Sequence, residues 1–140
     1  MHMKTLNADW EALAGQRMEF TRKFYQRLFE RYPRYQELFP QELDTQMEKM
    51  VEMFSGIARF ADHIDIIRPY LVEVGFAHRR LGIDAQDVEN FKDVFIETLG
   101  ELCAGWWNEE HEQAWHQAFE DMIVPMFDEG LETGRRQRSA

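Results

Sequence analysis

Three polar side chains, Tyr25, Gln46 and His78, interrupt apolar stripes that recur at helical spacing along the chain. A buried donor or acceptor without a partner costs about 1–3 kcal/mol, so each of these side chains needs one. Taken alone, His78 would be an ordinary core histidine. Together, the three form either an internal hydrogen-bond network or the polar part of an apolar pocket, and the spacing does not choose between the two.

A metal site made of protein side chains alone is not predicted, because the chain has no HxxxH, ExxH or CxxC spacing. A haem needs fewer protein ligands. Its porphyrin fills four coordination positions of the iron, so one axial imidazole, a large apolar slot and a few polar groups suffice. The abundant Phe, Trp and Met side chains suit such a slot, although they also build ordinary cores. His63, His111 and His116 have no convincing partner, and Cys103 is predicted to be a small buried side chain.

The elements that position these side chains are all predicted to be helices, because no segment alternates apolar and polar residues for long. Proline, glycine and capping signals divide the chain into about six helices. Their expected ranges are 9–15, 17–31, from 44 or 45, from 66 or 67, from 85 and from 109. Thr45 and Glu48 have capping-box spacing, Asp84 and Asn108 are predicted caps, and Pro125 is expected to interrupt the last helix.

Each helix is predicted to bury one face. The expected inward residues are Phe20, Phe24 and Leu28; Gln46, Met50, Met53, Ile57 and Phe60; Ile67, Leu71, Val74 and His78; Val88, Phe91, Phe95, Thr98 and Leu102; and His111, Trp115, Ala118, Met122 and Met126. These faces are the predicted core.

The composition favours one cytoplasmic domain. A chain of 140 residues with 44% hydrophobic residues can bury one sizeable core. We expect residues 1–140 to form that domain, with frayed ends over 1–6 and 132–140. The net charge of -10 would repel nucleic acid and an anionic membrane surface, so neither is an expected partner. No apolar run is long enough to span a bilayer, and the first residues lack a signal peptide's apolar segment.

Three stretches match a known family: FYQRLFERYPRYQELF at 24–39, the stretch from Gln46 through Pro69 to HRRLGI at 78–83, and EQAWHQAF around Trp115. On these stretches the sequence resembles the bacterial single-domain haemoglobins and the globin part of flavohaemoglobins. The resemblance covers nearly the whole chain, and the order and spacing of the first two stretches are specific. It implies an all-α globin fold of about six to seven helices packed around a haem pocket.

The resemblance also implies roles for individual residues. His78 matches the proximal histidine, which binds the iron of haem b, while Tyr25 and Gln46 match the distal tyrosine and glutamine, which hydrogen-bond the gas ligand. The other implied cofactor contacts are Phe39, which matches the haem-stacking phenylalanine, Met50, Ile83 and, as propionate partners, Lys49 with Arg79 or Arg80.

The proximal side departs from the flavohaemoglobin pattern. The tyrosine and glutamate that buttress the proximal histidine in that pattern are replaced by Val88 and Gly130. Without a carboxylate partner, the proximal imidazole is expected to donate to the carbonyl oxygen of Val74, which makes it a less electron-rich ligand. Glu129 would replace the missing glutamate only if Pro125 shifted the register of the last helix.

The resemblance implies a haem protein that reversibly binds a diatomic gas, first O2 and then NO or CO, for storage, delivery or sensing. The alternative is conversion of nitric oxide to nitrate with an external reductase as partner, since the chain has no GxGxxG or flavin-binding segment. A third interpretation is a haemless globin-like module that acts as an interaction surface. No catalytic residue is predicted, and the sequence leaves a homodimer open.

Overall fold

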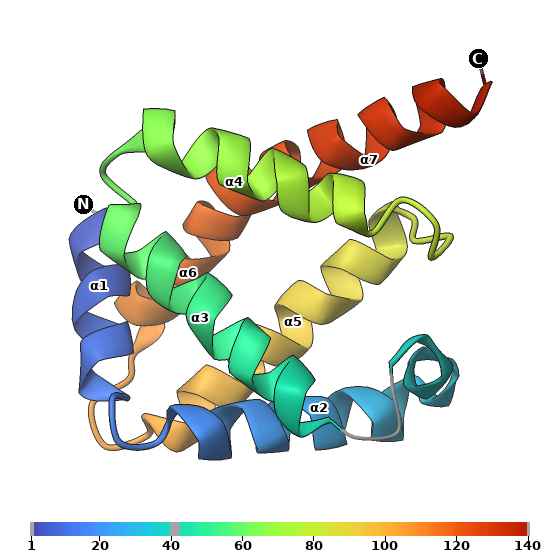
Figure 1. The fold of residues 1–140 in the computed structure, drawn as a ribbon. Coiled ribbons are helices and arrows are strands. Elements are labelled where there is room, and N and C mark those ends of the chain that lie inside the picture. The colour runs from blue at the N-terminus through green and yellow to red at the C-terminus, as the bar shows by residue number, and fades with distance from the viewer. Residues whose placement is uncertain (1, 40–42, 140) are drawn as a thin grey trace.

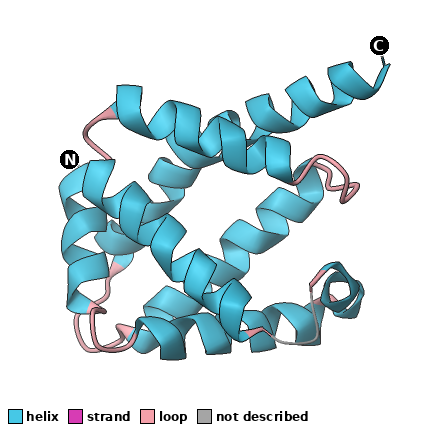
Figure 2. Ribbon diagram, viewed as in Figure 1, coloured by secondary structure: helices cyan, strands magenta, loops and turns pink. Residues whose placement is uncertain are grey.

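The computed structural model describes residues 2–39 and 43–139, and the side chains of 4–39 and 43–133. This part of the chain forms α1 (His2–Ala12), α2 (Arg17–Arg31), the 3-10 turn η1 (Pro33–Leu38), α3 (Asp44–Phe60), α4 (Ile64–Ala77), α5 (Ala85–Leu102), α6 (Glu109–Ala118), the π-helical turn η2 (Phe119–Ile123) and α7 (Val124–Ser139). Figure 2 shows helices and loops throughout these residues, which confirms the all-α prediction. None of the described helices has the length and apolar character needed to cross a membrane.

The helices cross one another instead of running as a parallel bundle (Figure 1). α4 lies along α7 at the top of the view, α1 packs on α6, and α2 packs against both α3 and α5 at the bottom. Where these helices meet, Phe20, Phe54 and Phe95 pack with ring centroids 5.0 Å (Phe20–Phe95) and 4.3 Å (Phe54–Phe95) apart. All three are at most 1% exposed. Burial of such rings is the main favourable contribution to folding.

Two of the predicted caps are present and one is not. Asp84 accepts a hydrogen bond from the backbone N–H of Asp87 at 2.9 Å, and Asn108 caps α6 in the same way. The capping box predicted at Thr45 is wrong, because α3 begins at Asp44 and has no side-chain cap, so Thr45 already lies inside the helix. The helix nevertheless begins at the predicted place.

Both ends of the described chain are helical beyond the predicted limits. α1 begins at His2 and not at Asp9, and residues 132–139 belong to α7. Leu6 and Trp10 are 0% and 1% exposed and join the core cluster. Their spacing of four residues places both on one face of α1, which explains why the helix starts early.

The inward face is predicted correctly for α2 but rotated for α3. In α3 the buried residues include Met47 and Phe54, whereas the predicted Gln46 and Met53 are partly exposed and line a cavity. Phe60 is also only partly buried. The helix is covered on two sides, by the core and by the cavity, so a single stripe does not describe it.

A buried carboxylate links α1 to α6. Asp9 is 2% exposed and accepts hydrogen bonds from Nδ1 of His111 and Nε1 of Trp115, both at 2.9 Å. The prediction that His111 has no partner is therefore wrong. Its partner lies far away in sequence, on a different helix.

We expect Asp9→Asn to lower the free energy of unfolding of the apoprotein by about 2–3 kcal/mol. A hydrogen bond to a charged group typically contributes about 1.5–3 kcal/mol, and Asp9 accepts from two donors while it is shielded from water. Urea unfolding followed by circular dichroism measures the change. Asp62→Asn, at an exposed position after α3, is the matched control and is expected to leave the midpoint unchanged.

Candidate functional site

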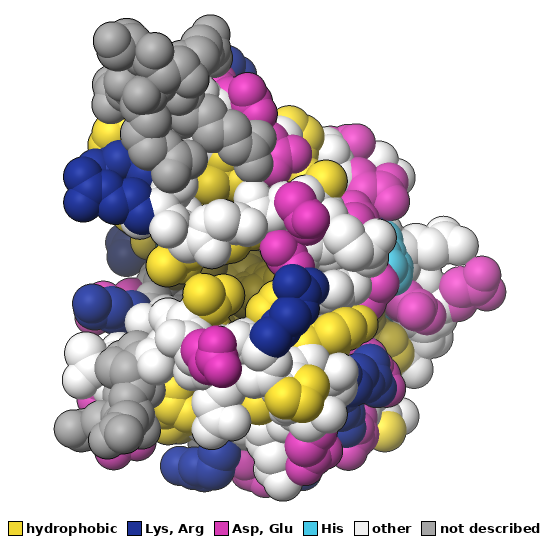
Figure 3. Space-filling model, turned by 90° about the vertical axis from the view of Figure 1, so that its right-hand side faces the viewer, with side chains coloured by type: hydrophobic (Ala, Val, Ile, Leu, Met, Phe, Trp, Pro, Cys, Tyr) yellow, Lys and Arg dark blue, Asp and Glu magenta, His cyan; other side chains and the backbone are white. Residues whose placement is uncertain are grey.

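One cavity of about 520 Å³ brings together most of the predicted site residues. Those that line it are Tyr25, Phe39, Gln46, Lys49, Met50, His78 and Ile83. Its other walls are mainly apolar, and Figure 3 shows a hollow between hydrophobic side chains on one face of the molecule. A cavity of this volume lies within the ordinary range for small-molecule and cofactor pockets, roughly 300–1,000 Å³.

His78 follows the last turn of α4 and presents its imidazole to this cavity. Its Nδ1 lies 2.7 Å from the carbonyl oxygen of Val74. A carbonyl oxygen only accepts, so Nδ1 carries the hydrogen, and in the neutral form of this tautomer the lone pair is on Nε2. Phe127 of α7 packs edge-on against the ring, with centroids 5.2 Å apart. The hydrogen bond predicted from the sequence is confirmed, and the imidazole is fixed with Nε2 available as a metal ligand.

α4 and α7 are in close contact beside His78, and glycines on both helices make this possible. A Cβ atom on Gly130 would overlap the carbonyl oxygen of Val72 and lie 2.6 Å from the backbone nitrogen of Phe76. A Cβ atom on Gly75 would overlap the carbonyl oxygen of Phe127 in the same way. The helix contact therefore leaves no room for a side chain where the flavohaemoglobin pattern has its buttressing glutamate.

Pro125 interrupts the last helix, as predicted. The π-helical turn η2 ends just before it, and α7 continues from Val124. Proline has no N–H to donate to the preceding turn, and a π-helical turn is one way in which a helix accommodates such a break. This break does not turn Glu129 toward the imidazole, because its carboxylate pairs with Arg68 at 2.8 Å.

Tyr25 and Gln46 form a second polar part of the cavity wall. Tyr25 is 3% exposed and packs against Phe39, with ring centroids 5.3 Å apart. Burial raises the pKa of the Tyr25 hydroxyl to about 12, although a hydrogen bond from Gln46 acts to lower it. The phenol therefore keeps its proton at neutral pH and can donate a hydrogen bond into the cavity.

The three basic side chains predicted near the cofactor lie in different places. Lys49 lines the cavity from an exposed position on α3. Arg79 donates to the carbonyl oxygen of Phe76 at 3.0 Å and covers the ring of that residue. Arg80 is exposed in the turn after α4 and is not among the residues that line the cavity, so its contact with a propionate stays a prediction.

The family model described as Globin matches residues 22–126. The chain belongs to the globin family. This globin is 27% identical over 122 residues to a flavohemoprotein of Vibrio cholerae, an alignment that covers 84% of this chain and 31% of the relative. It therefore spans about a third of the length of that relative. An uncharacterized globin-like protein of Aquifex aeolicus is 22% identical over 102 residues, which cover 73% of this chain and 72% of that protein.

Two solved structures share the fold of this globin. A bacterial globin from Campylobacter jejuni superposes with a TM-score of 0.79 at 15% identity, over 99% of this chain and 98% of that one. An engineered carbene transferase, made from a candidate nitric oxide dioxygenase of Rhodothermus marinus, superposes with a TM-score of 0.85 at 19% identity, over 98% and 96%. The globin fold and the resemblance to flavohaemoglobin globin domains are thus confirmed, and membership of this family implies haem binding.

Sequence reasoning missed four polar residues that line the cavity of this globin: Tyr35 of η1, Glu52 of α3, Tyr70 of α4 and Asp87 of α5. Asp87 did carry a signal, since it lies three residues after the predicted cap Asp84 and completes a capping box. Tyr35 lies in a short turn without helical periodicity, so its burial could not be inferred from spacing.

Proposed function

We propose that this globin is a haem protein that reversibly binds a diatomic gas, with O2 as its main ligand and NO and CO as further ligands. The observation that carries the proposal is the cavity of about 520 Å³, which holds an imidazole with a free Nε2 together with two hydrogen-bonding side chains. Haem b, when bound, supplies the iron that coordinates the gas.

The residues of the cavity fit a porphyrin. His78 would hold the haem iron through Nε2, because its Nδ1 already donates to Val74. Phe39, Met50 and Ile83 line the cavity and supply apolar contacts. Lys49 is the proposed partner of a propionate carboxylate at the rim, where an exposed ion pair contributes little to affinity.

Tyr25 and Gln46 are the proposed hydrogen-bond donors to the gas. A diatomic ligand that has drawn electron density from a metal carries partial negative charge, which a phenol O–H or an amide N–H stabilises. Each such donor contributes about 0.5–1.5 kcal/mol, and more when the acceptor is charged. Since the Tyr25 phenol keeps its proton up to strongly basic pH, this stabilisation is present throughout the neutral range.

Titration of the purified apoprotein with haemin tests the proposal. We expect a Soret band that saturates at equimolar haemin and shifts when the reduced protein binds carbon monoxide. If the protein with excess haemin shows no Soret absorption beyond that of free haemin, the proposal is overturned. The haemless interaction module would then be the remaining interpretation.

Tyr25→Phe is expected to release O2 about 10- to 100-fold faster than the wild type. The substitution removes one hydrogen bond to a partly charged acceptor, worth about 1.5–3 kcal/mol, and each 1.4 kcal/mol changes an equilibrium tenfold. Stopped-flow displacement of O2 by carbon monoxide measures the rate. Tyr70→Phe removes the same hydroxyl from a 40% exposed position on the cavity lining and should release O2 at nearly the wild-type rate. Equal rates for all three proteins would exclude Tyr25 as a donor.

A second candidate function is conversion of nitric oxide to nitrate with an outside reductase as electron donor. The fold shared with the candidate dioxygenase of Rhodothermus marinus and the relation to a flavohemoprotein favour it. The carbonyl partner of His78 argues against it, because a carboxylate would make the imidazole more electron-rich. Nitric oxide consumption measured with and without a reductase and reductant separates the two functions, since only an enzyme sustains turnover when electrons are supplied.

A further inference from the structure

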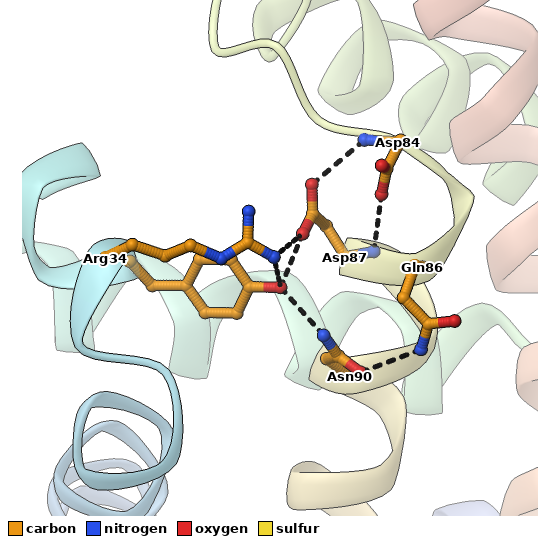
Figure 4. A network of polar contacts seen from close by, with 6 residues as sticks. Arg34, Asp84, Gln86, Asp87 and Asn90 are labelled. Carbon is orange, nitrogen blue, oxygen red and sulfur yellow. Dashed lines mark hydrogen bonds and ion pairs between the residues drawn. The ribbon is translucent and has the colours of Figure 1, made fainter.

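A polar network spans one edge of the cavity between η1 and α5 (Figure 4). The hydroxyl of Tyr35 donates to Oδ1 of Asp87 at 2.6 Å and accepts from Nδ2 of Asn90 at 3.0 Å. Arg34 donates to the same Oδ1 at 2.7 Å. Tyr35 and Asn90 are 6% and 8% exposed, so the centre of this Tyr35 network (Arg34, Tyr35, Asp87 and Asn90) is shielded from water.

The α5 side of the Tyr35 network is firmly held. Oδ2 of Asp87 accepts from the backbone N–H of Asp84 at 3.1 Å, and Asn90 accepts from Gln86 at 2.9 Å. Burial acts to raise the pKa of the Asp87 carboxyl, but hydrogen bonds from Tyr35 and Asp84, with the charge of Arg34, bring it below its ordinary value. The acceptor of the Tyr35 hydroxyl is therefore a carboxylate at neutral pH, and hydrogen bonds to an ionised acceptor are the stronger kind.

The two segments that the network joins both carry proposed porphyrin contacts. Phe39 directly follows η1 and packs on Phe29 of α2, with ring centroids 5.5 Å apart. Ile83 lies in the turn between His78 and α5. In the ribbon view, η1 and the start of α5 are drawn well apart (Figure 1), whereas side chains reach across in Figure 4. Side-chain hydrogen bonds thus join these two walls of the cavity.

We propose that Tyr35 is a positioning residue that holds the η1 and α5 walls of the cavity together and so controls how tightly the porphyrin is retained. This inference rests on the proposed haem function. A fully satisfied buried network fixes one arrangement, whereas loss of the hydroxyl removes the acceptor of the Asn90 amide and leaves Oδ1 of Asp87 with Arg34 as its donor in the network. The walls then separate more easily, and Phe39 and Ile83 no longer keep one fixed spacing.

The test compares Tyr35→Phe with Tyr32→Phe. Tyr32 packs on the ring of Tyr35 with centroids 5.2 Å apart, and it is not a member of the network, so its variant removes the same atom nearby. Haemin release is measured by transfer to an excess of apomyoglobin. We expect release about 10-fold faster from Tyr35→Phe, the effect of one lost hydrogen bond to a charged group, and a nearly unchanged rate from Tyr32→Phe.

A second readout separates positioning from folding. In the carbon monoxide form of Tyr35→Phe, the C–O stretching band is expected to broaden or split, because the cavity wall no longer has one position. A role in folding alone would lower the urea midpoint of the apoprotein but leave haemin release and this band unchanged, and that result would overturn the inference. Asp87→Asn keeps an acceptor but removes its charge, so it is expected to release haemin at an intermediate rate, and it replaces Tyr35→Phe if that variant does not fold.

The possible failures are distinguishable. A wild-type protein that takes up no haemin overturns both the proposed function and this inference. A wild-type protein that takes up haemin and a Tyr35→Phe variant that releases it at the wild-type rate overturn the inference alone.

Discussion

Replacement of His78 by alanine is expected to weaken haemin binding by at least about 100-fold and to abolish the spectrum of an imidazole-ligated haem. Changes to residues that merely support a metal ligand typically cost 10–100-fold in affinity, and loss of the ligand itself should exceed that range. Among the residues that line the cavity, His78 supplies the imidazole, and in the neutral tautomer that donates from Nδ1 to Val74 the lone pair is on Nε2. Titration followed at the Soret band measures the affinity.

His63→Ala is the matched control, since His63 is exposed at the start of α4 and lies outside the cavity lining. It should bind haemin like the wild type. A further variant, His78→Gly, leaves space for free imidazole, which should restore the wild-type spectrum of the reduced protein. An unchanged Soret band in His78→Ala would mean that another side chain ligates the iron, and the assignment of His78 would then be abandoned.

The features predictable from the sequence are those that depend on short spacings. The hydrogen bond from His78 to Val74 joins residues that are four apart in one helix, and the hydrogen bond of the cap at Asp84 joins residues that are three apart. Tyr25 and Gln46 were found because each interrupts an apolar stripe, and the structure brings both into the wall of one cavity. Whether these side chains bind a cofactor and a gas stays a prediction until the titrations are made.

The features that were not predictable depend on how the helices pack against one another in three dimensions. The pairing of Asp9 with His111 joins residues about a hundred positions apart, and Tyr35 reaches Asp87 across about fifty. Helical periodicity reports that a face is buried but not what covers it. The same limit explains why the inward face of α3 was predicted wrongly. One buried stripe was expected, whereas one part of the helix surface packs in the core and another part lines the cavity.

The contact between α4 and α7 leads to the second large effect, in which Gly130→Ala is expected to lower the free energy of unfolding by about 3 kcal/mol. The added Cβ meets the backbone of Val72 and Phe76, and backbone atoms cannot rotate aside as a flexible side chain can. Overpacking of this kind costs about 1–3 kcal/mol, and more where the helices themselves must move. Urea unfolding of the apoprotein measures the change.

Gly56→Ala serves as the control, and it is expected to raise the free energy of unfolding instead of lowering it. Gly56 lies within α3 and a Cβ there meets nothing within 4 Å, so the alanine should stabilise the helix by about 0.5–1 kcal/mol.

Gly130→Glu, which reinstates the glutamate of the flavohaemoglobin pattern, should be at least as unstable as Gly130→Ala. The packing of α4 on α7 thus keeps a carboxylate at position 130 away from the imidazole, because the two helices would have to separate to make room for it. A Gly130→Glu variant as stable as the wild type would show that this space can open, and the packing argument would then fail.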